Sequence, residues 1–475
     1  MNYFRLFNNT LQINYNMNRK KSVTFILITT VILSSCRKPE ISPVEDQDWY
    51  GGGTQTVFVT GVGAYSQPFF GLTEWQDKMH EVGDLAFEAT FVSAPAPKNQ
   101  GLGPVFNNVS CFSCHINDGR GKAPSEGANQ NLMPLLIRLS IAGQNEHGGP
   151  LPAPLYGGQL QTRAIFGSVP EATIDVNYQY ITETFADGES YELRIPIFTL
   201  QNMYAGTISG MMMSPRMAPP VFGMGLLEAI PESTILAFQD VYDADGDGIS
   251  GRANYVWNIQ EKRKTLGRFG WKANNPSILQ QVAAAYHEDI GITNFLFPVE
   301  SSYGQSQYIN YYNQSDLTDS LVHAAAFYMR TLAVPARRNI KDPEIIRGKK
   351  IFSDAKCTSC HVPKHRTGIN VSFGPVSNQL IFPYTDLLVH DMGAGLADNR
   401  PDWLANGQEW RTPPLWGIGL TEVVNGHSNF LHDGRARSLM EAILWHGGEA
   451  EHSKQYVKNL PKSDREALIK FLKSL

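Results

Sequence analysis

The sequence predicts a duplicated fold in which two related, helix-bearing modules follow one another along the chain. Three observations support this prediction. The motif Cys-x-x-Cys-His occurs at 111–115 and again at 357–361. A segment rich in proline and glycine also occurs twice, and each copy follows one of the two motifs. Apolar residues recur at helical spacing near the end of each half, at 317–332 and 467–475.

Composition limits the classes of function. The chain has 475 residues, 42% of them hydrophobic and 18% charged, which is enough to build one large core or two moderate ones. The formal net charge of −5, without a basic stripe, gives no sign of a nucleic-acid partner. The 42 glycines and 28 prolines predict many loops and insertions.

The N-terminus resembles the leader of a bacterial lipoprotein. Met17 is the better start, because a basic stretch at 18–21 and an apolar run at 23–33, too short to span a membrane, follow it. The run leads to Cys36 in a sequence similar to a lipobox. Residues 1–36 are therefore predicted to be a signal peptide, with Cys36 as the lipidated first residue of a periplasmic, membrane-anchored protein. The alternative is ordinary secretion with a spare cysteine.

The other four cysteines belong to two haem-attachment motifs. In each motif, two thiols one helical turn apart can add to the vinyl groups of a haem, and the adjacent histidine binds the iron. Zinc ligation and a redox disulfide are the alternatives, but neither requires a histidine after each pair. The sequence thus predicts two covalently attached haem c groups. The attachment residues are Cys111, Cys114, His115, Cys357, Cys360 and His361.

The chain is predicted to divide after the signal peptide into a tether and two haem domains, at 37–63, 64–340 and 341–475. The first domain is long enough to need insertions. Alternating residues at 173–181 and 191–195, separated by a turn at 186–189, predict that one insertion is a β-hairpin. Ser463 opens a capping box that predicts the start of a last amphipathic helix.

An internal repeat and several motifs resemble the bacterial di-haem cytochrome c peroxidase superfamily, and within it the di-haem oxidoreductase branch often labelled thiol oxidoreductase. Residues 215–228 align with 410–422. The resemblance implies a mainly α fold of two packed cytochrome c-like haem domains, with loop and β-hairpin insertions in the first. The thiol label has no support, because no cysteine is left for exchange. The segments that carry the resemblance are 156–160, 214–220, 223–231, 243–252, 267–273 and 430–435.

The resemblance also implies that the two irons differ. In the superfamily, a His-Asp-Gly segment of the C-terminal module leads to the distal ligand of that haem, and here 432–434 leads to His446. The peroxidases place methionine at this point and the methylamine-pathway maturation enzymes place tyrosine. His446 therefore implies a bis-histidine haem with His361 and a lower reduction potential. Met392 is the alternative ligand, and no comparable residue is evident for the N-terminal haem.

Peroxidases of the superfamily need a carboxylate above the open haem for general acid–base catalysis. Glu228 follows the first copy of the repeat, where the family delivers this acid, and is the predicted catalytic acid ahead of Glu232. A paired structural glutamate is the alternative. Arg216 is predicted to polarise peroxide or to bind a haem propionate. Trp271 is predicted to pack in the core, and the resemblance implies electron relay between the haems as the alternative.

A calcium-like loop occurs in the first domain. Asp243, Asp245 and Asp247 alternate before Gly248, which is the oxygen spacing of a calcium loop. Asn254 stands where an EF-hand has its bidentate glutamate, so the loop departs from that pattern. Calcium binding is predicted here, and an acidic turn without metal is the alternative.

The resemblance implies a peroxidase as the function. Hydrogen peroxide is expected to react at the N-terminal haem, with electrons relayed by the C-terminal haem from a small cytochrome or another periplasmic donor. Two other functions stay open. One is a non-catalytic electron-transfer protein with both irons six-coordinate, and the other is a haem oxygenase or oxidase of an organic substrate.

Overall fold

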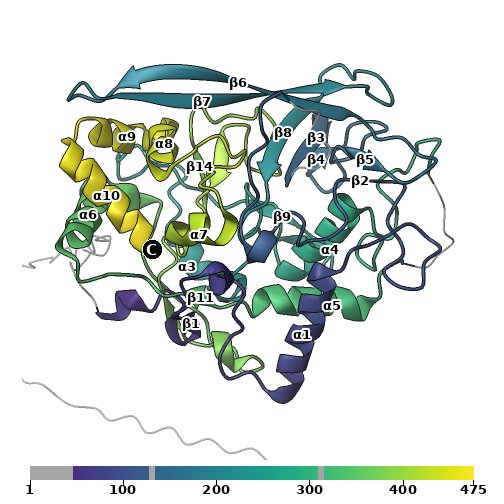
Figure 1. Ribbon diagram of the computed structural model, residues 1–475, viewed down its shortest axis with the longest axis horizontal. Helices are drawn as coiled ribbons and strands as arrows, with labels where there is room; N and C mark the ends of the chain where they lie inside the picture. Colours follow the sequence, from purple (N-terminus) through teal and green to yellow (C-terminus); the bar gives the residue numbers. More distant parts are fainter. Residues whose placement is uncertain (1–45, 128–133, 309–314) are drawn as a thin grey trace, which may run out of the picture. The chain divides into compact units, whose positions relative to one another are not determined.

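Two pairs of packed helices frame the two Cys-x-x-Cys-His motifs in the computed structural model, which describes residues 46–127, 134–308 and 315–475. In each pair, one helix precedes the motif and the other comes from the far end of the module. The pairs are α1 (Glu74–Glu88) with α5 (Asp319–Arg330), and α6 (Pro343–Asp354) with α10 (Lys462–Ser474) (Figure 1).

Both pairs depend on a glycine where the two helices meet. A Cβ atom added to Gly83 would collide with the carbonyl oxygen of Ala324, and one added to Gly348 would collide with that of Ala467. Only glycine allows such close approach of two backbones. This shared glycine contact supports the prediction that the two modules arose by duplication.

A second pair of helices is also related between the modules. These helices are α4 (Ile278–Ile290) and α8 (Leu439–Leu444). Ser277 and Ser438 cap them, because each hydroxyl accepts a hydrogen bond from the backbone N–H three residues on, at 3.2 and 3.1 Å. A bridge between two backbone positions closes the turn before each cap. The bridges join Phe269 to Asn275 and Phe430 to Ala436.

Strands fill much of the first module. Only 28% of the described residues are helical and about 20% are in strands, so the prediction of a mainly α fold is wrong. The helices predicted near the module ends are present, but the insertions between them form small sheets from alternating, β-branched and aromatic residues. One three-stranded sheet has the order β4 (Pro150–Leu151), β3 (Leu135–Gln144) and β8 (Met212–Met217).

The predicted insertion hairpin is confirmed. β6 (Thr173–Thr184) pairs with β7 (Ser190–Gln201) in an unbroken antiparallel register. Figure 1 shows the two strands running from the β3–β8 sheet across to α8 and α9 (Glu451–Lys458). The tip of this first-module hairpin enters the core of the second module, where Phe185 is 7% exposed and Leu193 is 6% exposed.

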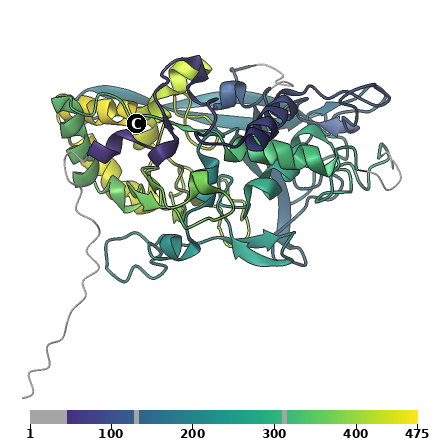
Figure 2. The same ribbon diagram turned by 90° about the horizontal axis from the view of Figure 1, so that it is seen from below.

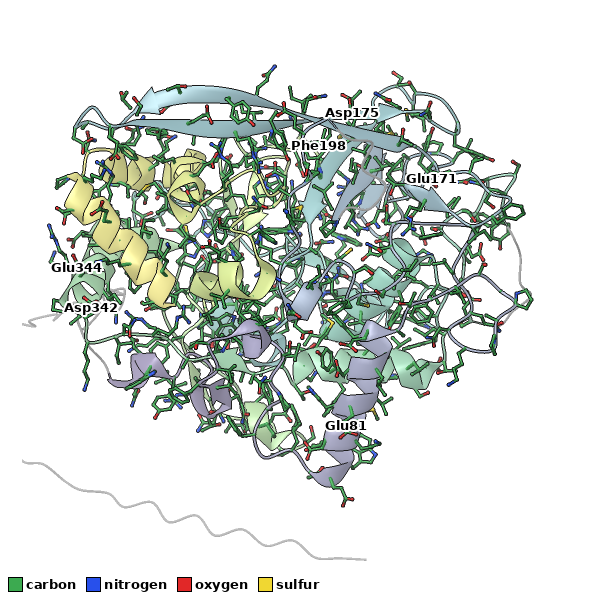
Figure 3. The ribbon with its side chains drawn as sticks, in the orientation of Figure 1. Glu81, Glu171, Asp175, Phe198, Asp342 and Glu344 are labelled. Atoms are coloured by element: carbon green, nitrogen blue, oxygen red, sulfur yellow. The ribbon has the colours of Figure 1, made fainter. Side chains whose placement is uncertain are left out.

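A buried carboxylate holds the base of the hairpin. Glu171 lies just before β6 and is fully buried (Figure 3). Its Oε2 atom accepts a hydrogen bond from the Gln161 N–H at 2.7 Å, and its Oε1 atom accepts one from the Gln305 amide at 2.5 Å. Burial raises the pKa of this carboxyl to about 8.

The predicted tether 37–63 is described from Asp46 onward, and there it packs on the body. Asp48 is 4% exposed and forms ion pairs with Arg337, at 2.7 Å, and with Lys349. β1 (Thr56–Val57) then pairs in parallel with β11 (Val334–Pro335). The segment therefore joins both predicted haem domains, and Figure 2 shows the same elements from below.

The described residues belong to one compact unit, and the boundary predicted between 340 and 341 stays a prediction. No helix among the described residues is long and apolar enough to cross a membrane. The predicted signal peptide and Cys36 lie outside the described residues. The remaining short helices are η1 (Asp46–Trp49), η2 (Gly53–Gln55), η3 (Val62–Ala64), η4 (Ile116–Asp118), α2 (Met224–Glu228), α3 (Glu232–Leu236), η5 (Cys357–Ser359), η6 (Gly374–Val376), η7 (Ile418–Leu420), α7 (Thr421–Asn425) and η8 (Gly448–Ala450). The remaining strands are β2 (Val105–Phe106), β5 (Arg163–Ala164), β9 (Tyr255–Asn258), β10 (Arg263–Leu266), β12 (His365–Arg366), β13 (Leu380–Ile381), β14 (Val389–Asp391) and β15 (Glu409–Arg411).

The two copies of the proline- and glycine-rich repeat face each other. Gly223 and Gly417 occupy equivalent places and both have left-handed backbone angles, with φ of 71° and 70°. A Cβ atom on Gly223 would meet the ring of Trp416 at 2.5 Å, and one on Gly417 would meet the ring of Phe222 at 2.5 Å. Each glycine thus makes room for the aromatic ring of the other copy, so the repeat forms a reciprocal contact between the modules.

Candidate functional site

One cavity reaches both Cys-x-x-Cys-His motifs. Its wall contains the two cysteines and the histidine of each motif, together with residues of α4 and α8. The four thiols form no disulfide. The donor groups that two haem c groups require are therefore gathered along one continuous space between the modules.

The two motif histidines are oriented as iron ligands. His115 Nδ1 donates a hydrogen bond to the Pro219 carbonyl at 2.7 Å, and His361 Nδ1 donates one to the Tyr384 carbonyl at 3.0 Å. These bonds fix the tautomer and leave Nε2 with its lone pair. Burial lowers the pKa of both imidazoles to about 4, so each is neutral and able to bind a metal. The residues present therefore fit two haems.

His446 lies in the wall of the same cavity, beyond the end of α8. Its Nδ1 atom donates a hydrogen bond to the Ala442 carbonyl at 2.7 Å, which again leaves Nε2 free. Burial lowers the pKa of this imidazole as well. Its geometry matches that of the two motif histidines, as expected of the predicted distal ligand. Met392, the alternative, also lines the cavity.

The equivalent position in the first module is an alanine. Ala285 lies eight residues after the helix cap Ser277, as His446 lies eight residues after the cap Ser438. Both residues line the cavity. The Phe–Ser spacing that precedes each helix is the same in the sequence, at 269–277 and 430–438, and this signal could have revealed the equivalence. The two haem sites therefore differ at the place where a distal ligand would stand.

A carboxylate lies one turn beyond Ala285 on the same face of α4. Glu288 lines the cavity and forms an ion pair with Arg138 of β3, which lines it too. The side chains are 24% and 17% exposed, so the pair is largely shielded from solvent. Gln281, one turn before Ala285, also faces the cavity. Sequence reasoning missed these residues, because β3 and α4 are far apart along the chain.

A model of the family described as "Di-haem oxidoreductase, putative peroxidase" matches residues 46–475. The chain belongs to the di-haem oxidoreductase family. No curated protein matches this di-haem oxidoreductase.

Two solved structures are similar to parts of the di-haem oxidoreductase. A hydrazine synthase of Kuenenia stuttgartiensis is 21% identical, with a TM-score of 0.23, over 34% of this chain and 57% of its own. A MauG-like protein associated with microbial copper homeostasis is 16% identical, with a TM-score of 0.27, over 54% of this chain and 88% of its own. The di-haem oxidoreductase thus spans little more than half of the matched hydrazine synthase chain.

Glu228, the predicted catalytic acid, is placed outside the cavity wall of the di-haem oxidoreductase. Its Oε1 atom accepts a hydrogen bond from the Ile278 N–H at 2.8 Å, at the start of α4. Its Oε2 atom accepts one from Arg330 Nε at 2.7 Å. These contacts occupy both oxygens and favour the alternative, a paired structural glutamate. Glu232, the second candidate, also lies outside the wall and accepts from the Tyr255 hydroxyl.

Arginines line the cavity of the di-haem oxidoreductase in both modules. Arg216 and the repeat-related Arg411 are 4% and 9% exposed, and Arg120 is 8% exposed. Arg216 pairs with Asp402 at 2.9 Å. Burial alone would raise the pKa of Asp402, but the surrounding cations outweigh it and lower the pKa to about 2. Guanidinium groups of this kind can hold haem propionates.

Two aromatic residues and a histidine line the space between the haem sites. Trp271 and His432 occupy equivalent positions before α4 and α8, and their rings meet edge to face at 6.5 Å. The His432 ring stacks on Trp410 at 3.7 Å. Burial lowers the pKa of His432 to about 4, so this imidazole is neutral. Trp271 packs in a buried apolar cluster, as predicted, and it also lines the cavity, where the alternative role of electron relay would place it.

The acidic loop differs in part from its prediction. Side-chain oxygens of Asp240, Asp243 and Asp245 lie within 4.8 Å of one another, whereas Asp247 is outside this group. Asp247 instead accepts a hydrogen bond from the Ile249 N–H at 3.0 Å. Asp240 was missed because it precedes the alternating pattern. Calcium binding at the loop stays a prediction.

Proposed function

We propose that this di-haem oxidoreductase reduces hydrogen peroxide at the N-terminal haem with electrons relayed by the C-terminal haem. Each haem is covalently attached through the two cysteines of its motif. The observation that supports this proposal most directly is Ala285 at the place where the second module has His446. Alanine has no donor atom, so one site is left open for a small ligand while the other is closed.

The closed site suits electron transfer. His361 and His446 both line the cavity and use Nδ1 in hydrogen bonds, so their Nε2 atoms would hold the iron of the second haem, which would supply electron-transfer chemistry. The bound haems supply the redox chemistry itself. Trp271, between the two sites, offers a path for electrons from the second module to the first.

The open site needs a group that moves protons. Reduction of hydrogen peroxide to two waters consumes two electrons and two protons, and one proton must pass between the peroxide oxygens. Glu288 lies one turn from Ala285 and can accept this proton from one oxygen and deliver it to the other. Arg138 holds the carboxylate in place and stabilises negative charge that develops on the departing oxygen.

The partners and the location of the protein are inferred from its sequence. A small cytochrome or another periplasmic donor supplies the electrons, and nucleic acid is not a partner. A lipid on Cys36 anchors the mature protein to a membrane from the periplasmic side. Cytochrome c maturation outside the cytoplasm is consistent with that location.

Matched glutamine variants test the assignment of the acid. Glu288→Gln should lower peroxide turnover by about 100-fold while both haem spectra persist. Glu228→Gln is the control, because it changes a carboxylate outside the cavity, and its turnover should stay near that of the wild type. The reverse result would restore Glu228 as the acid and remove Glu288.

Electron paramagnetic resonance of the oxidised, haem-loaded protein tests the proposal as a whole. We expect one low-spin and one high-spin signal, with the high-spin signal lost when peroxide is added. Ala285→His should convert the high-spin signal to low-spin. If the wild type instead shows two low-spin signals that do not change on addition of peroxide, in both its oxidised and its half-reduced state, the protein is an electron carrier.

A further inference from the structure

We propose that a band of exposed aromatic side chains next to the N-terminal segment docks against the interfacial region of the lipid bilayer. This inference rests on the proposed lipid at Cys36. We call these residues the aromatic band. Its members are Trp49 (42% exposed), Tyr50 (48%), Phe58 (59%), Phe70 (57%) and Trp75 (66%).

The first three members form one cluster. The rings of Trp49 and Tyr50 lie 6.0 and 5.9 Å from the ring of Phe58, and both contacts are edge to face. The rings contact one another although more than 40% of each residue stays exposed. The cluster is therefore a packed apolar surface rather than three isolated side chains.

The rest of the band lies near this cluster through intervening residues of the body, not through contacts between the band members themselves. Gln55, next to β1, accepts a hydrogen bond from the Phe70 N–H at 2.7 Å. Phe69 stacks on Phe373 at 6.5 Å. Phe373 contacts Phe327 at 5.7 Å, and Phe327 contacts Trp75 at 6.4 Å. In Figure 1, η1, β1 and the first turn of α1 all lie at the lower side of the body, which agrees with these contacts.

Two exposed aliphatic residues precede Phe373 in the sequence. Ile369 and Val371 are 85% and 98% exposed and lie just before Phe373. The charged residues beside Trp75 on α1, Glu74, Asp77 and Lys78, are exposed and carry both signs, so they give the surface little net charge. A surface of this composition gains free energy from leaving water, and its affinity should respond little to salt.

The position of the anchor identifies the bilayer as the partner. Nine residues, 37–45, separate Cys36 from the first described residue. Fully extended, they span about 30 Å, so a lipid on Cys36 keeps the start of the body close to the membrane. Trp49 and Tyr50 lie within five residues of the end of this segment. Tryptophan and tyrosine concentrate at the membrane–water interface, because they join an apolar ring to a polar N–H or hydroxyl.

Docking through the band would hold the body in one orientation at the membrane. The band occupies the side that carries η1, β1 and α1, whereas the β6–β7 hairpin lies on the opposite side in Figure 1. The side that carries the hairpin would then face the periplasm, where a soluble electron donor approaches.

Vesicle binding of the haem-loaded mature chain tests the proposal without the lipid. Cys36→Ser removes the acylation site, and sedimentation with phosphatidylcholine vesicles measures what the surface contributes alone. In this background, Trp49→Ser, Phe58→Ser and Trp75→Ser together should lower the partition coefficient by about tenfold or more. The matched control combines Phe166→Ser and Tyr242→Ser, which are 105% and 92% exposed and lie outside the band. This control should bind vesicles like its parent.

The outcomes separate this proposal from the anchor and from a protein partner. The docking proposal would be overturned if the band variant and the control partition equally into vesicles. It would also be overturned if high salt abolishes binding. A band variant that binds vesicles normally but accepts electrons more slowly from a soluble cytochrome would overturn it too. The mass of the mature N-terminus reports separately on Cys36, so a missing lipid would refute the anchor while the vesicle result still decides on the band.

Discussion

Arg465 joins the tip of the β6–β7 hairpin to α10, and its removal measures how firmly the hairpin is held. The Arg465 side chain is 3% exposed. It pairs with Asp187 at 2.9 Å and with Glu189 at 2.6 Å. Its guanidinium lies over the Phe185 ring, 3.9 Å from the centroid, and donates to the Leu460 carbonyl at 2.6 Å. Arg465→Ala removes all four contacts.

The buried contacts set the size of the effect. Both carboxylates reach solvent, so their ion pairs add little. A cation over a desolvated ring contributes about 2 kcal/mol, and a hydrogen bond from a charged donor to a carbonyl contributes about 1.5 kcal/mol. Arg465→Ala is therefore expected to lower the free energy of unfolding by about 3–4 kcal/mol.

Guanidinium denaturation of the haem-loaded protein, followed by tryptophan fluorescence and by the haem spectrum, measures this loss. Lys462→Ala is the control, because Lys462 is 61% exposed and pairs only with Glu189 among the described residues, at 2.9 Å. Its stability should be close to that of the wild type. If Arg465→Ala loses less than about 0.5 kcal/mol, the hairpin tip is not held by this residue and the reasoning fails.

Three further predictions concern single residues. His446→Ala should convert the C-terminal haem to a high-spin species, and an unchanged spectrum would remove His446 from the axial position. The pKa of Glu171 is raised from 4.5 to about 8, so its protonated form stabilises the folded protein fully below pH 4.5, and this contribution is lost as pH rises through about 8. Glu171→Gln should flatten that part of the stability profile, and an equally steep profile in the variant would contradict the assignment. Gly223→Ala places a methyl group against the Trp416 ring at a left-handed backbone position. The substitution should lower the free energy of unfolding by about 2–4 kcal/mol. A loss under about 1 kcal/mol would contradict this prediction.

The sequence predicts best what local pattern determines. The two Cys-x-x-Cys-His motifs, the hairpin at 173–201 and the helix α5 are all present, because each depends on neighbouring residues. The start of the last helix was less well predicted. α10 begins at Lys462 after Pro461, and Ser463 makes no capping hydrogen bond. A proline with its fixed φ can begin a helix without a side-chain cap.

Long-range pairing decides what the sequence could not show. The share of strand was underestimated because β3 pairs with β8, which is remote along the chain. Glu288 was missed for a related reason, since Arg138 reaches it from that same sheet. Glu228 was chosen from its place after the repeat, but Arg330, which comes from α5, engages its carboxylate.

The hairpin that crosses between the modules also sets an order of assembly. Phe185 and Leu193 are buried among residues that lie near the C-terminus, such as Phe471 and Leu472. During synthesis, the hairpin emerges long before those partners, so its tip stays exposed to water until the last helix has been made. The first half of the chain therefore cannot complete its folding alone. A truncated chain that ends after the first module should leave this apolar tip uncovered, where proteases and chaperones would recognise it.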